Sequence, residues 1–276
     1  MKICFIGGGN MATALIGGLT GKGYSAQQIA VVEISADNRS RLENDFSVQT
    51  FSDIAAGISG SEIIVLAVKP QQLREVAEIL APLQSGQLLI SIAAGIRAVD
   101  LARWCKSQAI VRAMPNTPAL IRSGMTGLYA LPAVSLDQRD EAQNILNAVG
   151  ETLWLQDEQM LDAVTAISGS GPAYVFYLIE ALQQAAREIG FNAEDARRLS
   201  LATFLGASKL AAESEEDVSV LRARVTSKNG TTERALLSMA ENRVAASIVQ
   251  AAKAAQARSR EMGDELGGEP GSNKEC

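Results

Sequence analysis

The sequence contains no histidine, only three cysteines and few aromatic residues, which make up 4% of its 276 residues. The lack of histidine excludes Ser-His-Asp and Cys-His nucleophile systems and most zinc sites. Cys4, Cys105 and Cys276 cannot form a disulfide framework, so we interpret them as core filling and as an exposed terminal thiol. We expect no metal site, and an enzyme of this composition depends on a cofactor for its difficult chemistry.

Long apolar runs and clusters of positive charge are missing as well. No stretch of 18 or more apolar residues offers a membrane span, and the first residues lack the order of a signal peptide. There are 25 Lys and Arg against 31 Asp and Glu, so the net charge is −6, and no basic cluster stands out. We expect a cytoplasmic protein without a nucleic-acid or membrane partner. The length is sufficient for two domains, each with its own core.

A glycine-rich segment near the N-terminus is the strongest indication of a ligand. Ile6 ends a predicted buried strand, and the residues Gly-Gly-Gly-Asn-Met at 7–11 lead into a predicted helix. Gly7 permits a sharp turn, and Gly9 permits the close approach of a pyrophosphate, which the N–H groups at the helix start would bind. The alternative interpretation is a tight strand-to-helix turn without a ligand.

Short β-rich runs alternate with helical patterns up to about residue 160, which is typical of a doubly wound parallel sheet. Strands are predicted at 2–6, 30–34, 62–68, 87–92, 109–113, 126–130 and 152–155. Helices are predicted at 11–20, 37–44, 71–81, 98–105 and 137–148. Ligands in such sheets bind outside the carboxyl ends of the strands, so we expect the segments 67–70, 93–95 and 114–118 to line one crevice. This part, 1–160, is predicted to be a dinucleotide-binding domain.

Helical patterns dominate after residue 160, where no strand is convincing. Helices are predicted at 173–189, 194–212, 218–225, 231–241 and 243–261. The first of these is apolar through most of its length, so it must be buried in its own domain or against another subunit. We predict a helical domain at 161–262 that forms the core of a homodimer. Residues 263–276 are rich in Gly, Glu and Ser and are predicted to be a disordered tail.

Two hydroxyl-rich turns stand out in the helical half. The turn at 168–174 (Ser-Gly-Ser-Gly-Pro-Ala-Tyr) is predicted to present hydroxyls and free amides at the start of a helix. The turn at 226–233 (Thr-Ser-Lys-Asn-Gly-Thr-Thr-Glu) has the donors of an anion site suited to a carboxylate. Helix capping alone also explains either turn. Beside a dinucleotide site, the two turns together favour a substrate pocket.

These motifs, in their order and spacing, resemble the pyrroline-5-carboxylate reductase family, whose members make proline by reducing a cyclic imine. The resemblance rests on the glycine segment, 67–70, 93–95, 114–118 and the two hydroxyl-rich turns, and it spans residues 1–262. It implies a Rossmann-type first domain and a helical second domain that interlocks with another subunit. The family's dimers often assemble into larger rings such as decamers.

Site residues follow from the resemblance, position by position. The residues implied to bind the cofactor are Ile6, Gly7, Gly8, Gly9, Asn10, Met11, Ser35, Ala67, Val68, Lys69, Pro70, Ala93, Ala94 and Asn116. Those implied to bind the substrate, a cyclic imine carboxylate, are Glu215, Ser227, Asn229, Gly230, Thr231 and Thr232. The Thr232 hydroxyl is implied to face the ring nitrogen, which makes it the candidate catalytic residue. An imine that binds protonated needs no strong general acid, which suits a chain without histidine.

The sequence departs from the family in two places. Lys228-Asn229 replace the usual Pro-Gly of the second turn, and Asn tolerates the left-handed backbone that a glycine would adopt there. Ile54, after Asp53, stands where many members have an Asn that helps to bind the ribose 2′-phosphate of NADPH. Glu33 and Asp37 would repel this phosphate if they faced the ribose. The resemblance favours NADPH, with NADH as the alternative.

Two other functions are consistent with part of the pattern. A hydroxyacid dehydrogenase also joins a dinucleotide domain to a helical one, but it needs a proton-transferring lysine. Lys209, Lys228 and Lys253 are the candidates in the helical half, and none lies in a recognisable motif. A nucleotide-sensing module would explain the glycine segment and the apolar helices, and it would leave the second turn as a cap.

Overall fold

The computed structural model describes residues 1–268; residues 269–276, including Cys276, lie outside this description. Contacts divide the chain into two units: Met1–Ser170 together with the chain from Ala255 onward form the first, and Gly171–Ala254 form the second. The expected boundary at 160/161 and the expected tail from 263 both differ from this division. Each unit is described by itself below.

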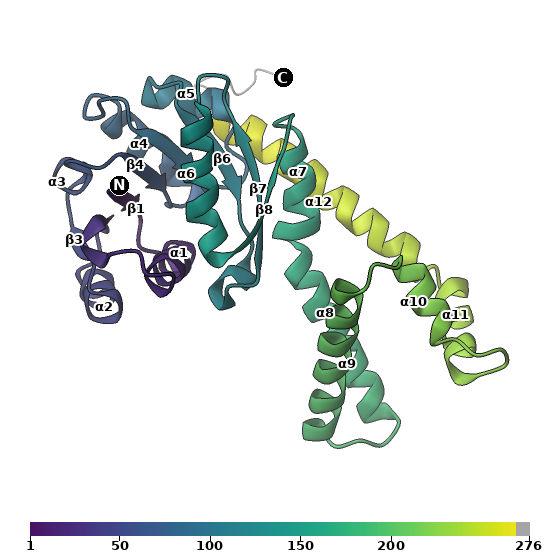
Figure 1. Cartoon of the computed structure of the whole chain (residues 1–276). Coiled ribbons are helices and arrows are strands. Elements are labelled where there is room, and N and C mark those ends of the chain that lie inside the picture. Colours follow the sequence, from purple (N-terminus) through teal and green to yellow (C-terminus); the bar gives the residue numbers. More distant parts are fainter. Residues whose placement is uncertain (269–276) are drawn as a thin grey trace. The chain divides into compact units, whose positions relative to one another are not determined.

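The first unit is built on an eight-stranded sheet with the strand order β3-β2-β1-β4-β5-β6-β7-β8 (Figure 1). The strands are β1 (Ile3–Ile6), β2 (Ile29–Val32), β3 (Gln49–Phe51), β4 (Ile63–Leu66), β5 (Leu88–Ser91), β6 (Ile110–Met114), β7 (Gly124–Ala130) and β8 (Gly150–Trp154). Neighbouring strands run parallel except β6 and β7, which are antiparallel. The prediction of a doubly wound, mainly parallel sheet is therefore confirmed, with one reversal that the pattern did not indicate.

Helices cover both faces of this sheet, because the central strands are apolar on both sides and must be buried. The helices of this unit are α1 (Asn10–Gly21), α2 (Ala36–Phe46), α3 (Ile54–Ile58), α4 (Pro70–Leu80), α5 (Ala98–Cys105), α6 (Leu136–Leu146) and α7 (Met160–Val164). One core cluster joins the sheet to α1, α2 and α6, and the other joins it to α3, α4 and α5. Every residue of β1, β2, β4 and β5 is buried.

The second unit is helical throughout, as predicted. Its elements are α8 (Gly171–Glu188), α9 (Ala193–Glu213), α10 (Val218–Arg224), α11 (Thr231–Glu241) and the first part of α12 (Val244–Gly267). Among its residues, all of which are described, only Ala186, Ala196 and Ser200 are buried. Large apolar side chains such as Phe176 and Leu205 are 61% and 72% exposed. The apolar helix predicted at 173–189 is therefore not covered within its own unit.

The end of α12 corrects the prediction of a tail that begins at 263. The helix continues to Gly267, and its last turns pack on the first unit. The Arg97 guanidinium pairs with Asp264, and Arg103 donates to the Gly267 carbonyl oxygen at 2.7 Å. Leu266 packs against the core cluster of α3, α4 and α5. These contacts hold a segment whose composition alone indicated disorder.

The turn predicted at 168–174 is also different in the structure. Thr165–Gly169 forms a π-helical turn, and the Ser170 N–H donates to the Thr165 carbonyl oxygen at 2.8 Å. The segment is thus helical, so it does not present a row of free amides. The Ser168 hydroxyl lies 3.1 Å from the Asn116 side-chain amide, which donates to it.

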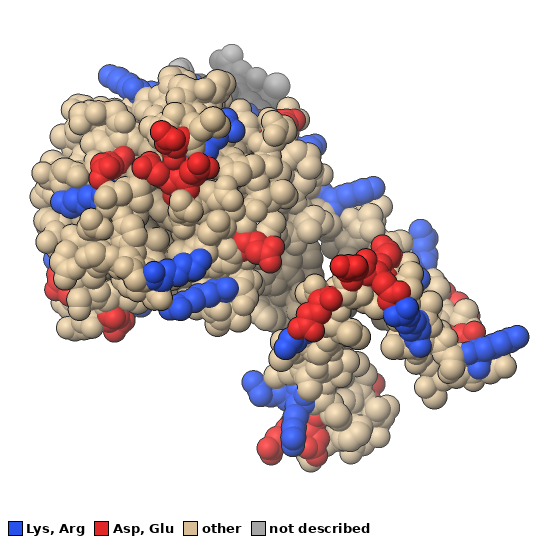
Figure 2. Space-filling view, in the orientation of Figure 1, with Lys and Arg blue, Asp and Glu red and all other residues tan. Residues whose placement is uncertain are grey.

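No helix within residues 1–268 is both long enough and apolar enough to cross a membrane. On the face shown in Figure 2, Lys and Arg side chains are interspersed with Asp and Glu among uncharged residues.

Candidate functional site

The glycine segment forms a tight turn between β1 and α1. Gly7 has a φ of +102°, and a Cβ at this position would lie 2.7 Å from the Ala67 carbonyl oxygen. Gly9 is the N-cap of α1, no side chain caps the helix, and a Cβ on Gly9 would meet nothing within 4 Å. No acidic residue lies in the first turn of the helix. The N–H groups at this helix start, with open space at Gly9, fit the pyrophosphate of a dinucleotide.

A cleft of about 510 Å³ lies over this turn, at the carboxyl ends of β1, β2 and β4. Seven of the predicted cofactor residues line it: Ile6, Gly7, Gly8, Gly9, Ala67, Val68 and Lys69. Of the three segments predicted to line one crevice, residues 67–69 line this cleft. The segments 93–95 and 114–118 do not line this cleft, although Ala93 and Ala94 follow the end of β5.

The other predicted cofactor residues lie at the starts of helices or in a loop. Asn10 and Met11 begin α1, and Pro70 begins α4. Ser35 is the N-cap of α2, where its hydroxyl accepts from the Asn38 N–H at 3.3 Å. Asn116 connects three segments: its amide donates to Ser168, and its carbonyl oxygen accepts from the Met125 N–H at 2.9 Å. The side chains of Ser35 and Asn116 are therefore held in place by hydrogen bonds to other residues of the first unit.

The cleft is also lined by residues outside the predicted cofactor-binding set. They are Val32, Glu33, Ile34, Ser52, Asp53, Ile54, Gln72, Glu75, Val76 and Ile79. Glu33 follows β2 directly, and its carboxylate accepts from the N–H groups of Gly8 and Ser35, both at 2.9 Å. From the sequence, Glu33 is expected to repel a 2′-phosphate if it faces the ribose, and the structure places Glu33 in the lining of the dinucleotide cleft.

The hydroxyl-rich turn at 226–233 lies in the second unit and ends at the start of α11. Asn229 has a φ of +59°, which confirms that Asn can provide the left-handed backbone needed there. Its N–H donates to the Glu233 carboxylate at 2.7 Å. A Cβ on Gly230 would lie 2.3 Å from the Ser227 hydroxyl oxygen and 3.0 Å from the Ser227 carbonyl oxygen, so a larger residue here would require the Ser227 side chain to move.

The start of α11 has no side-chain cap. Gly230 is the N-cap, and no hydroxyl of the turn accepts from the helix amides. The interpretation that Thr231 or Thr232 is present to cap the helix is therefore not supported. Glu215 is exposed in the bend between α9 and α10, where its neighbour Glu216 pairs with Arg224.

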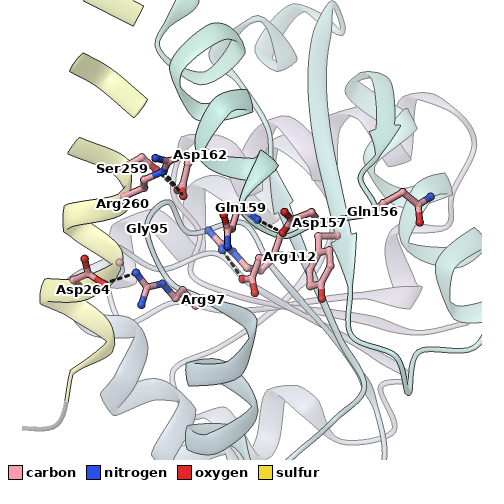
Figure 3. Close-up of a pocket in the computed structure, with 13 residues that line it drawn as sticks. Gly95, Arg97, Arg112, Gln156, Asp157, Gln159, Asp162, Ser259, Arg260 and Asp264 are labelled. Carbon is pink, nitrogen blue, oxygen red and sulfur yellow. Dashed lines mark hydrogen bonds and ion pairs between the residues drawn. The ribbon is translucent and has the colours of Figure 1, made fainter. Parts of the chain in front are cut away.

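A second cavity of about 710 Å³ lies in the first unit between the β5–α5 loop, the segment after β8 and the end of α12 (Figure 3). Each of its three arginines pairs with a carboxylate: Arg97 with Asp264, Arg112 with Glu158 at 2.6 Å, and Arg260 with Asp162 at 3.9 Å. Although this cavity is larger than the first cleft, the helix start that faces it is occupied, because Glu158 accepts from the Ala98 N–H at 2.6 Å, and Asp157, Asp162 and Asp264 add further negative charge. The first cleft is therefore the one that fits a dinucleotide.

Family models match both halves of the chain. Residues 2–95 match the model described as NADP oxidoreductase, coenzyme F420-dependent. Residues 158–262 match the model described as pyrroline-5-carboxylate reductase dimerisation.

Individual relatives match along nearly the whole length. A pyrroline-5-carboxylate reductase of Pseudomonas aeruginosa is 46% identical over 96% of this chain and 98% of its own. A solved pyrroline-5-carboxylate reductase from Coxiella burnetii has a TM-score of 0.90 and 39% identity, covering 95% of this chain and 98% of that one. The Plasmodium falciparum pyrroline carboxylate reductase, solved with NADP bound, has a TM-score of 0.86 and 29% identity over the same shares. With its cleft, its helical unit and such relatives along nearly its whole length, the chain belongs to the pyrroline-5-carboxylate reductase family.

Proposed function

We propose that this protein reduces the C=N bond of 1-pyrroline-5-carboxylate to give L-proline, the last step of proline biosynthesis, with a reduced nicotinamide dinucleotide. The observation that carries the proposal is the uncapped glycine turn under the 510 Å³ cleft, in a chain that is 46% identical to a pyrroline-5-carboxylate reductase over nearly its whole length. The turn at the start of α11 also supports the proposal. Its backbone N–H groups make it the candidate site for the substrate carboxylate.

The cofactor would be held mainly by the backbone. Gly7 and Gly9 keep the turn free of side chains, and the N–H groups of Asn10 and Met11 face the pyrophosphate position at the start of α1. The path from adenosine to nicotinamide would follow Ala67, Lys69, Pro70, Ala93, Ala94 and Asn116, in keeping with the family resemblance. When bound, the reduced nicotinamide supplies the hydride that adds to the imine carbon.

The substrate carboxylate would bind to the backbone N–H groups of Gly230, Thr231 and Thr232. The Gly230 N–H donates to the Ser227 carbonyl oxygen at 3.0 Å, whereas no side chain occupies the N–H groups of Thr231 and Thr232, which remain available to an anion at the start of α11. The Thr232 hydroxyl is both donor and acceptor, so it can orient the ring nitrogen in either protonation state. Orientation and proximity of this kind are worth about 7–11 kcal/mol in favourable cases, which suits a site that lacks histidine.

The dimerisation match and the exposed apolar helices of the second unit support a homodimer. Assembly of dimers into a decamer, contact of Glu215 with a partner's substrate and a cytoplasmic location are further proposals from the family resemblance. For the cofactor, NADPH is supported by the NADP bound to the Plasmodium relative, whereas Glu33 in the cleft supports NADH.

The direct test is the loss of reduced-nicotinamide absorbance on addition of 1-pyrroline-5-carboxylate, with proline identified as the product. Thr232→Ala should lower kcat/KM by about tenfold to a hundredfold, as expected for a lost hydrogen bond to a charged group, and leave dinucleotide affinity unchanged. Thr232→Ser should restore most of the activity. Thr20→Ala is the matched control, since its hydroxyl only donates to α1 carbonyl oxygens.

Three outcomes would contradict parts of the proposal. Unchanged turnover in Thr232→Ala would remove Thr232 from the site. Reduction of a 2-keto acid without reduction of the imine would favour a hydroxyacid dehydrogenase. Tight dinucleotide binding with no reduction of either substrate would favour a nucleotide-sensing module.

A further inference from the structure

The lining of the dinucleotide cleft is negatively charged overall. Three carboxylates line the cleft, those of Glu33, Asp53 and Glu75, and among the described residues that line it Lys69 is the one cation. Asp53 is turned toward α3, where it accepts from the Ala56 N–H at 2.9 Å. Glu33 lies closest to the glycine turn, at the end of β2, which is where the adenosine ribose lies in dinucleotide folds of this topology.

Two backbone hydrogen bonds fix the Glu33 carboxylate. One oxygen accepts from the Gly8 N–H at 2.9 Å and the other from the Ser35 N–H at 2.9 Å. The side chain therefore joins the glycine turn to the start of α2, and it cannot swing away without leaving both amides unpaired. A carboxylate has about four acceptor positions, so each oxygen keeps capacity for one more donor.

We propose that Glu33 makes this protein select NADH over NADPH; the proposal rests on the proposed dinucleotide-dependent reduction. The ribose hydroxyls of NADH are donors, and a fixed carboxylate can accept from them. The 2′-phosphate of NADPH is an anion without a strong donor, so the same carboxylate repels it and offers it no hydrogen bond.

The nearby arginine does not reverse this selection. Arg39, on α2, donates through Nη1 to the carbonyl oxygens of Glu33 at 2.7 Å and of Ile34 at 3.0 Å. It does not line the cleft. Its guanidinium thus braces the backbone of the β2–α2 loop. The apolar side chains of Ile34 and Ile54 line the same end of the cleft and supply no donor to a phosphate.

The first test is binding, which needs no substrate and no turnover. Titration of the wild-type protein with NADH and with NADPH, followed by nicotinamide fluorescence and by calorimetry, should give a Kd for NADH at least about tenfold lower, or about 1.4 kcal/mol. Added salt should narrow the ratio, because it screens the repulsion of the phosphate. Equal affinities, or tighter NADPH binding, would overturn the proposal.

Substitutions then test whether Glu33 is the residue that determines the preference for NADH. Glu33→Gln removes the charge at nearly the same size and should raise the NADPH/NADH affinity ratio by about tenfold. Glu33→Asp keeps the charge and should keep the preference for NADH. Glu75→Gln, a carboxylate on α4 in the same cleft, is the matched control and should leave the ratio within about twofold. An unchanged ratio in Glu33→Gln, or an equal change in Glu75→Gln, would contradict a specific role for Glu33.

Measurement of imine reduction with each cofactor distinguishes the proposed reaction from the proposed selectivity of Glu33. If NADH binds more tightly than NADPH and no imine is reduced with either, the proposed reaction fails and the selectivity of Glu33 stands. If the imine is reduced with a higher kcat/KM for NADPH and NADPH binds more tightly, the reaction stands and the selectivity fails.

Discussion

The two units of the chain differ in how completely they bury their apolar residues. In the first unit, β1, β2, β4 and β5 are fully buried between helices on both faces. In the second unit, three residues are buried and many large apolar side chains are exposed, although both units contain regular, well-capped helices such as α9. Regular secondary structure therefore does not by itself make a closed core.

This difference indicates where each unit obtains its stability. Burial of apolar area is the main favourable contribution to folding, at roughly 25 cal/mol per Å². The first unit gains it within one chain, and residues of this unit line the whole cleft. The second unit exposes Phe176, Tyr177 and Leu205 on its helices, and exposed apolar surface on this scale marks an interaction surface. We infer that a second copy completes its core.

The largest effect is expected from a substitution that disrupts the inferred contact between the second units of two chains. Phe176→Glu should convert the dimer to a monomer at micromolar concentration, because a buried charge in a two-fold interface is introduced twice. The measurement is molar mass by light scattering after size exclusion. Dinucleotide affinity should stay within about twofold, since the whole cleft belongs to the first unit.

Leu136→Glu is the matched control for this substitution. Leu136 is 79% exposed at the start of α6 in the first unit, and a charge there should leave the molar mass unchanged. A dimer that survives Phe176→Glu with unchanged affinity between its chains would show that the exposed apolar side chains of α8 do not form the interface.

Most of the fold could be predicted where local pattern and burial agree. The run Ile63–Leu66 is apolar on both faces and is the central strand β4, and Gly190 lies two residues after the end of α8. The three-residue strand β3 was missed because Gln49 is exposed and the strand is too short to show a pattern. Helix α3, five residues long, was missed for the same reason.

The site could be predicted only where it is local in sequence. The glycine turn is one continuous segment, so its role is visible in the sequence. The bond from Gly8 to Glu33 spans 25 residues and the one from Asn116 to Ser168 spans 52, and no residue pattern encodes such contacts. The end of α12 was predicted to be a tail because its glycines suggest disorder. Gly267 instead packs closely on the first unit, since a Cβ there would lie 2.3 Å from the Asp100 carboxylate.

An intermediate effect on stability is expected from removing the end of α12, which belongs to the first unit. A chain that ends at Met262 loses the Arg97–Asp264 pair and the bond from Arg103 to Gly267, which together should cost about 1–2 kcal/mol. For a unit of this size, that lowers Tm by a few degrees. A chain that ends at Gly268 is the matched control because it keeps these contacts. Equal melting temperatures would show that the last turns of α12 do not stabilise the first unit.

The smallest expected effect is a change of the free energy of unfolding with pH, caused by two buried thiols of the first unit. Burial raises the pKa of both Cys4 and Cys105 from 9.0 to about 12, and both thiols lie in the first unit. In the unfolded chain they ionise near pH 9, whereas in the folded chain they keep their protons. The folded state therefore binds more protons above pH 9, and its free energy of unfolding falls as the pH rises from 9 toward 12.

At pH 10 this loss should be on the order of 1 kcal/mol for each thiol relative to pH 7.5, measured by urea unfolding. Tyrosine and lysine also titrate in this range, so the comparison needs the Cys4→Ala, Cys105→Ala double variant, in which those groups are unchanged. The variant should be less stable at pH 7.5 because of the cavities it creates, yet lose less stability on going to pH 10. An equal loss in both proteins would show that these thiols reach solvent in the folded state, and the first unit would then be less completely closed than its buried strands indicate.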